Sequence, residues 1–134
     1  MAILRSESVP IQSSADVVAV RQAVRSAATE LGFSLVDQTK IVTAASELAR
    51  NTLDYGGGGA LHLQTLNEGI RKGLKLLFED HGPGIPDIQM ALKDGFTTGG
   101  GLGLGLGGAR RLVNDFDIQS KVGEGTRITI TRWK

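Results

Sequence analysis

The carboxylate Glu47 and the amide Asn51 stand four positions apart in a segment whose apolar residues recur at helical spacing. Residues four apart lie one above the other on the same face of a helix. The amide oxygen of Asn51 can bind a hard ion such as Mg²⁺, and Glu47 can take a proton from an attacking hydroxyl or water. At 100° per residue the pair falls roughly 80–120° from the centre of the apolar stripe, which predicts the rim of the buried surface. Taken alone, the pair also fits an ordinary solvated polar face.

Seven glycines and three leucines fill positions 99–108, directly before the helix-like segment 109–116. Glycine accepts positive φ and lets the backbone approach a ligand, so several N–H groups can point at one anion. The helix start that follows adds unpaired N–H groups and partial positive charge, which favours phosphate. A flexible linker is the alternative, but little chain follows for it to connect.

An acid followed by a glycine turn, Asp80-His81-Gly82-Pro83-Gly84, comes after a predicted strand. A carboxylate held there can accept a hydrogen bond from an exocyclic amine and so select adenine over guanine, because leaving such an acceptor unpaired costs about 1–3 kcal/mol. The alternative is a plain turn, since Asp, Gly and Pro are all common in turns. His81 is interpreted as an incidental turn residue. Farther along, Gly123-Glu124-Gly125 predicts a hairpin turn, and the hydroxyl of Thr126 begins the last strand.

Hydrophobic periodicity and capping residues predict the elements that position these groups. The Gly56–Gly59 run ends the helix that carries Glu47 and Asn51. The result is a two-layer α/β sandwich with about five mostly antiparallel strands and three helices on one face. The predicted elements are a strand at 3–9, a helix capped by Ser13 or Ser14 and stopped by Gly32, a helix from Ser34 to about Leu53, strands at 60–67 and 74–78, a helix through Leu112, Val113 and Phe116, and strands near 117–121 and 127–133.

Length and composition restrict the function classes. The 134 residues predict one domain, 1–134, and the net charge of +1 gives no nucleic-acid footprint. The chain has no cysteine, which excludes disulfides and thiolate chemistry, and its two histidines are too scattered for a zinc site. No signal peptide or apolar run of about 18 residues is present, so we expect a cytoplasmic protein with no membrane partner.

Together, these motifs resemble the ATP-binding fold shared by gyrase, Hsp90, histidine kinases and MutL, the GHKL or Bergerat fold of the α+β class. The surrounding residues are similar to the RsbT-type serine/threonine kinases of the stressosome, and the resemblance runs from about residue 10 to Trp133. It rests on Glu47-x-x-x-Asn51, Asp80-x-Gly82-x-Gly84, Phe96-Thr97-Thr98, Gly101-x-Gly103-x-Gly105 and Gly123-x-Gly125-Thr126, and on the segments 36–38, 46–51, 79–80, 82–87 and 94–96.

The resemblance implies ATP and Mg²⁺ as cofactors and a role for each motif. Asn51 would hold Mg²⁺ between the phosphates, and Glu47 would be the catalytic base or orienting carboxylate for a serine hydroxyl. Asp80 would bind the adenine amine, Gly84 would let the base lie close, and Thr126 would assist through its hydroxyl. The implied nucleotide-binding residues are Asn51, Asp80, Gly82, Gly84, Ile85, Thr126 and a phosphate lid of Thr97, Thr98, Gly101, Leu102, Gly103, Leu104 and Gly105.

Such kinases phosphorylate STAS-domain proteins of the RsbS and RsbR kind and, once released, activate a PP2C-type phosphatase of the RsbU kind. A non-catalytic anti-sigma factor of the SpoIIAB or RsbW type carries the same motifs and is the main alternative. Gly103-x-Gly105-x-x-Gly108 also spells a dinucleotide fingerprint, but no clear strand precedes it, and no P-loop motif occurs. Neither histidine lies on a helix that could serve a histidine kinase as phospho-acceptor.

Overall fold

The computed structural model describes residues 2–93 and 105–134. Within these residues five strands form one sheet in the order β1-β2-β3-β5-β4, and every neighbouring pair is antiparallel. The predicted five-stranded sheet is therefore confirmed. The elements are β1 (Ala2–Ile11), α1 (Ser14–Leu31), α2 (Leu35–Asp54), β2 (Gly59–Glu68), β3 (Arg71–Asp80), α3 (Ile88–Ala91), α4 (Gly105–Arg111), β4 (Asp115–Lys121) and β5 (Gly125–Trp133).

The two long helices begin and end at residues that the sequence marks for this role. The hydroxyl of Ser13 accepts from the N–H of Asp16 at the start of α1, and Ser34 accepts from Asp37 at the start of α2. Both contacts satisfy an N–H group that the helix itself cannot pair. Gly32 ends α1 with φ 85°, a left-handed conformation that suits glycine.

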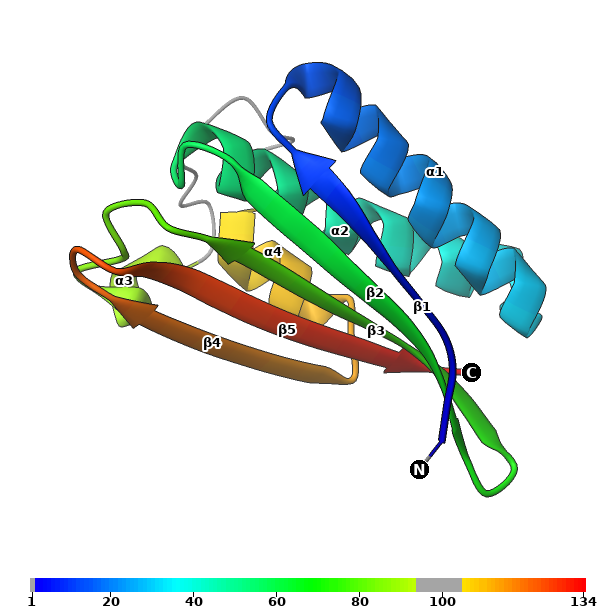
Figure 1. Cartoon of the computed structure of the whole chain (residues 1–134). Coiled ribbons are helices and arrows are strands. Elements are labelled where there is room, and N and C mark those ends of the chain that lie inside the picture. The colour runs from blue at the N-terminus through cyan, green and yellow to red at the C-terminus, as the bar shows by residue number, and fades with distance from the viewer. Residues whose placement is uncertain (1, 94–104) are drawn as a thin grey trace.

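Helices α1, α2 and α4 lie together on one face of the sheet, and no helix of the described residues lies over the other face (Figure 1). The apolar residues of α1 and α2 pack against alternating leucines of β2 and β3 to form the core. Helical spacing along the second helix predicts a buried stripe, and its members are all buried: Ile41, Ala45, Leu48 and Thr52. Burial of such a stripe is the main stabilisation that a two-layer fold offers.

Two of the helices differ from the prediction. The third helix ends at Arg111 rather than running through Phe116, because Phe116 belongs to β4 and pairs with Ile130 of β5. Tertiary pairing overrides the weak helical pattern there. The one-turn helix α3 was not predicted; it begins where the carboxylate of Asp87 accepts from the N–H of Met90.

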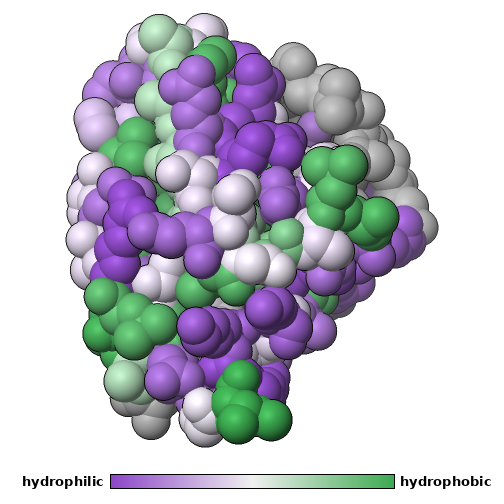
Figure 2. Space-filling model, turned by 90° about the vertical axis from the view of Figure 1, so that its right-hand side faces the viewer, coloured by the Kyte–Doolittle hydropathy of each residue, from purple (hydrophilic) through white to green (hydrophobic). Residues whose placement is uncertain are grey.

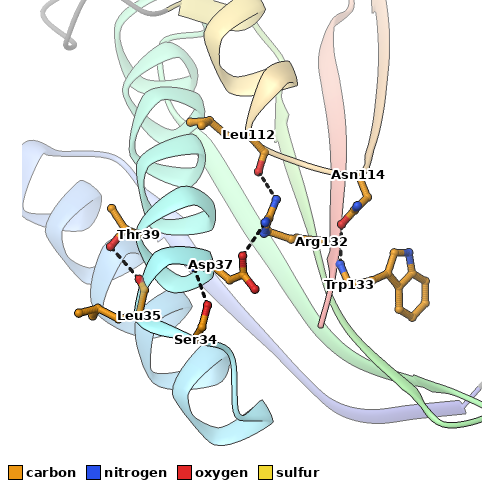
Figure 3. Close-up of polar contacts among 8 residues, drawn as sticks. All are labelled: Ser34, Leu35, Asp37, Thr39, Leu112, Asn114, Arg132 and Trp133. Carbon is orange, nitrogen blue, oxygen red and sulfur yellow. Dashed lines mark hydrogen bonds and ion pairs between the residues drawn. The ribbon is translucent and has the colours of Figure 1, made fainter.

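Arg132 near the end of β5 connects the sheet to two parts of the helical layer (Figure 3). Its guanidinium donates to a carboxylate oxygen of Asp37 at 2.6 Å and to the carbonyl of Leu112, just after α4, at 2.9 Å. This partly buried ion pair lowers the pKa of Asp37, chiefly through the hydrogen bond from Arg132. It fixes the N-terminus of α2 and the C-terminal end of α4 against the same strand.

Hydrophilic and hydrophobic side chains alternate over the surface on the side seen in Figure 2, and its hydrophobic areas are separated by hydrophilic ones. No helix within the described ranges combines the length and apolar character that crossing a bilayer requires.

Candidate active site

Glu47 and Asn51 lie on the same side of α2, as their spacing predicts, but at different depths. Asn51 is half-buried at the expected rim, whereas Glu47 is only 6% exposed. The prediction of a rim position was wrong for Glu47, because α2 is covered by α1, by α4 and by the sheet, which buries a wider arc than one stripe. A carboxylate at this depth is shielded from bulk water, which suits a group that must act on one bound hydroxyl.

Asp80 ends β3 with its side chain buried at 5% exposure. One of its carboxylate oxygens accepts from the N–H of Gly82 at 2.9 Å, which fixes the orientation of the group. Burial raises the pKa of Asp80 above its ordinary value of 3.8, while the backbone N–H groups of Gly82 and Thr126 oppose this shift. The carboxylate of Asp80 is thus an oriented hydrogen-bond acceptor that is shielded from solvent.

Two glycines form the wall beside this carboxylate. A Cβ on Gly56 would overlap the side chain of Asp80, and a Cβ on Gly82 would lie 2.6 Å from the carbonyl oxygen of Gly56. The loop after α2 and the loop after β3 therefore approach each other at a distance that only glycine allows. Gly56 was predicted only as a helix stop, and the sequence has no signal for this contact because it joins two separate loops.

The 82–85 loop is held from two sides. The hydroxyl of Tyr55 donates to the carbonyl of Gly84 at 2.8 Å from the helix side. From the hairpin side, the N–H of Gly123 donates to the carbonyl of Pro83, also at 2.8 Å. Gly84 has φ 78°, and a Cβ there would overlap the backbone of Lys121 in β4. The packing of the protein itself thus requires glycine at this position, in addition to any close approach of a ligand that glycine would permit.

Thr126 is predicted to assist base recognition, and its place in the fold puts it next to Asp80. The two residues are register partners in β3 and β5, and Thr126 is in turn paired with Ser120 of β4. The hydroxyls of Ser120 and Thr126 lie 2.8 Å apart, and Ser120 also accepts from the N–H of Ile85 at 2.7 Å. Asp80, Gly82, Gly84, Ile85 and Thr126 are thus brought together as the sequence predicts.

A hollow of about 270 Å³ opens at this end of the sheet, between the end of β3 and the hairpin that joins β4 and β5. Its lining includes Asp80, His81, Ser120 and Thr126. His81 is exposed, in agreement with its interpretation as a turn residue.

The predicted phosphate lid is described only at its last residue. Gly105 begins α4, which therefore starts inside the glycine-rich run and ahead of the predicted helix-like segment 109–116, and α4 packs against α2 and α3. Thr97, Thr98, Gly101, Leu102, Gly103 and Leu104 lie outside the described residues.

The donors available for a metal ion on α2 are oxygen atoms. In the described ranges no three His, Cys, Asp or Glu side chains come together as a metal-binding group. The amide oxygen of half-buried Asn51 is nevertheless the kind of ligand that Mg²⁺ takes when phosphates and waters fill its other positions. These residues fit a magnesium ion that arrives with a nucleotide rather than one held by the protein alone.

Comparison with known proteins agrees with this geometry. The sequence profile of the histidine kinase-, DNA gyrase B- and HSP90-like ATPase family matches residues 36–134. The chain therefore belongs to this ATPase family, whose members share the two-layer fold described above.

Sequence comparison with named relatives indicates which group within the ATPase family this chain belongs to. The chain is 50% identical to the serine/threonine-protein kinase RsbT of Bacillus subtilis (strain 168), over 93% of this chain and 94% of that protein. It is 29% identical to the anti-sigma F factor of Anoxybacillus flavithermus (strain DSM 21510 / WK1), over 84% and 80% of the two chains. Within the ATPase family, this protein belongs to the RsbT serine/threonine-protein kinases.

Solved structures confirm the fold. The RsbU and RsbW domains of a Mycobacterium tuberculosis protein superpose with a TM-score of 0.63 at 20% identity, covering 97% of this chain and 33% of that one. The mycobacterial sensor histidine kinase MprB superposes with a TM-score of 0.56 at 19% identity, covering 96% and 97% of the two chains.

Tyr55, Gly56 and Ser120 contact the site but were not predicted as part of it. For Ser120 a signal did exist: counting back from the predicted 123–125 turn places it opposite Thr126 in the hairpin. Tyr55 and Gly56 follow the helix that carries Asn51, and their contacts depend on how that loop meets the 80–84 turn.

Proposed function

We propose that this protein transfers the γ-phosphoryl group of ATP to a serine or threonine hydroxyl of a STAS-domain protein, with residues 1–134 acting as a single kinase domain. The observation that carries the proposal is the buried carboxylate of Asp80, oriented by the N–H of Gly82 and enclosed by Gly56. An oriented carboxyl acceptor in a shielded pocket is suited to the amine of adenine. Membership of the RsbT kinases supports phosphoryl transfer as the reaction.

The adenine end of the site would be formed by the β3 end and the β4–β5 hairpin. Asp80 accepts from the exocyclic amine, and Thr126 adds its hydroxyl beside it in register. The 82–85 loop, held by Tyr55 and the hairpin, forms one wall of the pocket. The fixed loop lowers the entropy cost of binding, because its backbone is already ordered before the base arrives.

The phosphate end would lie along α2, and the residues that the resemblance assigns to the phosphate lid, Thr97, Thr98 and 101–105, would contact the phosphates. Asn51 presents an amide oxygen for Mg²⁺, which would neutralise charge on the phosphates when it is bound. Glu47, buried one turn before Asn51 on the same side of the helix, orients the incoming hydroxyl and accepts its proton. Phosphoryl transfer requires mainly positioning and charge neutralisation, which rigid residues on one helix can provide.

The proposed partners follow from the RsbT family. The substrates would be STAS-domain proteins of the RsbS and RsbR kind, and after phosphorylation the kinase would bind and activate a PP2C-type phosphatase of the RsbU kind, in the cytoplasm where ATP is available. No observation favours an anti-sigma factor function for this chain, since the anti-sigma F factors are the more distant relatives.

A phosphotransfer assay tests the proposal. Purified protein is incubated with γ-labelled ATP, Mg²⁺ and a STAS-domain protein encoded beside it, and the modified residue is identified by mass spectrometry. Label on a serine or threonine of the partner supports the kinase. ATP-dependent binding of the partner without any transfer would instead identify a non-catalytic binding module.

A further inference from the structure

Ser120 forms the end of a polar row that crosses three strands on the helix-covered side of the sheet. Its register partner in β5 is Thr126, whose own partner in β3 is Asp80. Because directly opposed residues in antiparallel strands point to the same face, the three side chains stand next to each other. Asp80 and Thr126 are buried, and Ser120 is half-buried. Ser120 is therefore one residue removed from the carboxylate that meets the base.

The hydroxyl of Ser120 makes three contacts. It lies 2.7 Å from the N–H of Ile85, 2.8 Å from the hydroxyl of Thr126 and 3.2 Å from the carbonyl oxygen of Gly125. A serine hydroxyl has one proton to donate and two lone pairs to accept with. The N–H of Ile85 can only donate, and the carbonyl of Gly125 can only accept.

Only one placement of the hydroxyl protons of Ser120 and Thr126 makes all three contacts hydrogen bonds at the same time. Ser120 donates its proton to the carbonyl of Gly125, accepts from Ile85, and uses its second lone pair to accept from Thr126. The proton of the Thr126 hydroxyl is then committed to Ser120, so toward the pocket Thr126 presents only lone pairs. Buried polar groups adopt the arrangement that satisfies the most hydrogen bonds.

We propose that Ser120 is a positioning residue that holds the Thr126 hydroxyl as a hydrogen-bond acceptor and thereby makes the pocket selective for a 6-amino purine over a 6-oxo purine. The inference rests on the proposed function, because it takes the Asp80 end of the site as the base pocket. With Thr126 fixed in this way, Asp80 and Thr126 are two neighbouring acceptors. They match the two protons of an amine and repel a carbonyl oxygen in the same place.

Loss of the Ser120 hydroxyl would release this restriction. The Thr126 hydroxyl could then rotate and donate to a 6-oxo group, so a 6-oxo purine would gain a partner that the native pocket denies it. One neutral hydrogen bond gained in place of a repulsion corresponds to about a tenfold change in relative affinity. The N–H of Ile85 also loses its acceptor, which weakens binding of all nucleotides to a similar extent.

The test compares ADP with inosine diphosphate by calorimetry on the full chain; the two differ in the 6-amino or 6-oxo group and in the proton that the 6-oxo purine carries on N1, and the second difference is the same for every variant. For Ser120→Ala we expect the affinity ratio of ADP to inosine diphosphate to fall about tenfold. Ser120→Thr, which keeps the hydroxyl, should retain the native ratio. In a Thr126→Val background, Ser120→Ala should produce no further change in the ratio, because the hydroxyl that it controls is gone.

Each other result overturns the inference in a distinct way. An equal loss of affinity for both nucleotides in Ser120→Ala would make Ser120 a structural residue only. A native protein that binds both nucleotides equally would refute the base pocket itself, and with it the proposed role of Asp80. If Ser120→Ala fails to fold by circular dichroism, Ser120→Cys carries the test, since its thiol fills the space but is a weak hydrogen-bonding group.

Discussion

Replacing Asp80 with asparagine tests the base pocket with almost no change in shape. The native carboxylate has two acceptor oxygens, one of which accepts from the N–H of Gly82 at 2.9 Å. An asparagine has one acceptor oxygen and an amide that only donates. If its oxygen keeps the contact with Gly82, its NH₂ group takes the place of the second oxygen and faces the adenine amine. The NH₂ group of the asparagine and the adenine amine are both donors, so the hydrogen bond that the carboxylate accepts in the native protein is lost.

The expected loss is that of one hydrogen bond to a charged group, about 1.5–3 kcal/mol. This corresponds to roughly a 10- to 100-fold weaker affinity for ATP or ADP. The stability of the free protein should change by less than about 1 kcal/mol, because the neutral amide avoids the burial cost that raises the pKa of Asp80. A binding defect without a folding defect is thus the expected signature.

Isothermal titration calorimetry with ADP and Mg²⁺ measures the affinity, and urea denaturation measures the stability. Asp117→Asn is the matched control, since Asp117 is exposed on the edge strand β4 and has no place in the site. The control should bind as the native protein does. Native affinity for ADP in Asp80→Asn would show that this carboxylate does not recognise the base and would remove the main support for the proposed site.

Three further outcomes are expected. Glu47→Gln should leave ADP affinity within about threefold of native and slow transfer to the STAS-domain protein by about 10²–10⁴-fold, measured under single-turnover conditions; unchanged transfer would exclude the proposed proton acceptor. Arg132→Met should lower the free energy of unfolding by about 1–3 kcal/mol at neutral pH, because it leaves Asp37 without its main partner. Since Arg132 lowers the pKa of Asp37, this stabilisation is present above pH 3.8 and is lost as the pH falls through the native pKa. Denaturation curves taken across pH should therefore show the free energies of unfolding of the native protein and Arg132→Met converging in strong acid. Because burial raises the pKa of Asp80, its carboxyl takes up a proton at a pH above 3.8 and then no longer accepts from the adenine amine, so ADP affinity should fall as the pH is lowered through this pKa. Calorimetry across pH should find that this fall in affinity is missing in Asp80→Asn.

The local signals were strong enough to predict most of the elements. Serine caps at positions 13 and 34 mark the starts of α1 and α2, and the glycine turn at 123–125 marks the hairpin. The strand bounds were too short, since β3 extends over Arg71–Asp80 rather than 74–78. Charged residues at its start give no apolar pattern, and pairing with β2 keeps them in the sheet.

The motifs predicted the candidate site residues, but they did not predict the neighbouring residues that pack against them. Asp80 could be named from its residue type and the glycine turn after it, whereas Gly82, Gly84 and Thr126 were named from the resemblance to the RsbT-type kinases. Gly56 is needed because a Cβ there would overlap the side chain of Asp80, and a contact between residues of two separate loops produces no periodic pattern in the sequence.

The sequence by itself determined the order of the elements, their capped ends and the side chains proposed to carry the chemistry, because these depend on local periodicity and on residue type. Tertiary structure decided which of those side chains meet. Strand β3 lies between β2 and β5, so Asp80 stands beside Thr126 and, through it, Ser120, although the chain from Asp80 to Ser120 passes through α3 and α4. Such non-local pairing is set by the register of the whole sheet and by the core beneath it, which no short segment contains.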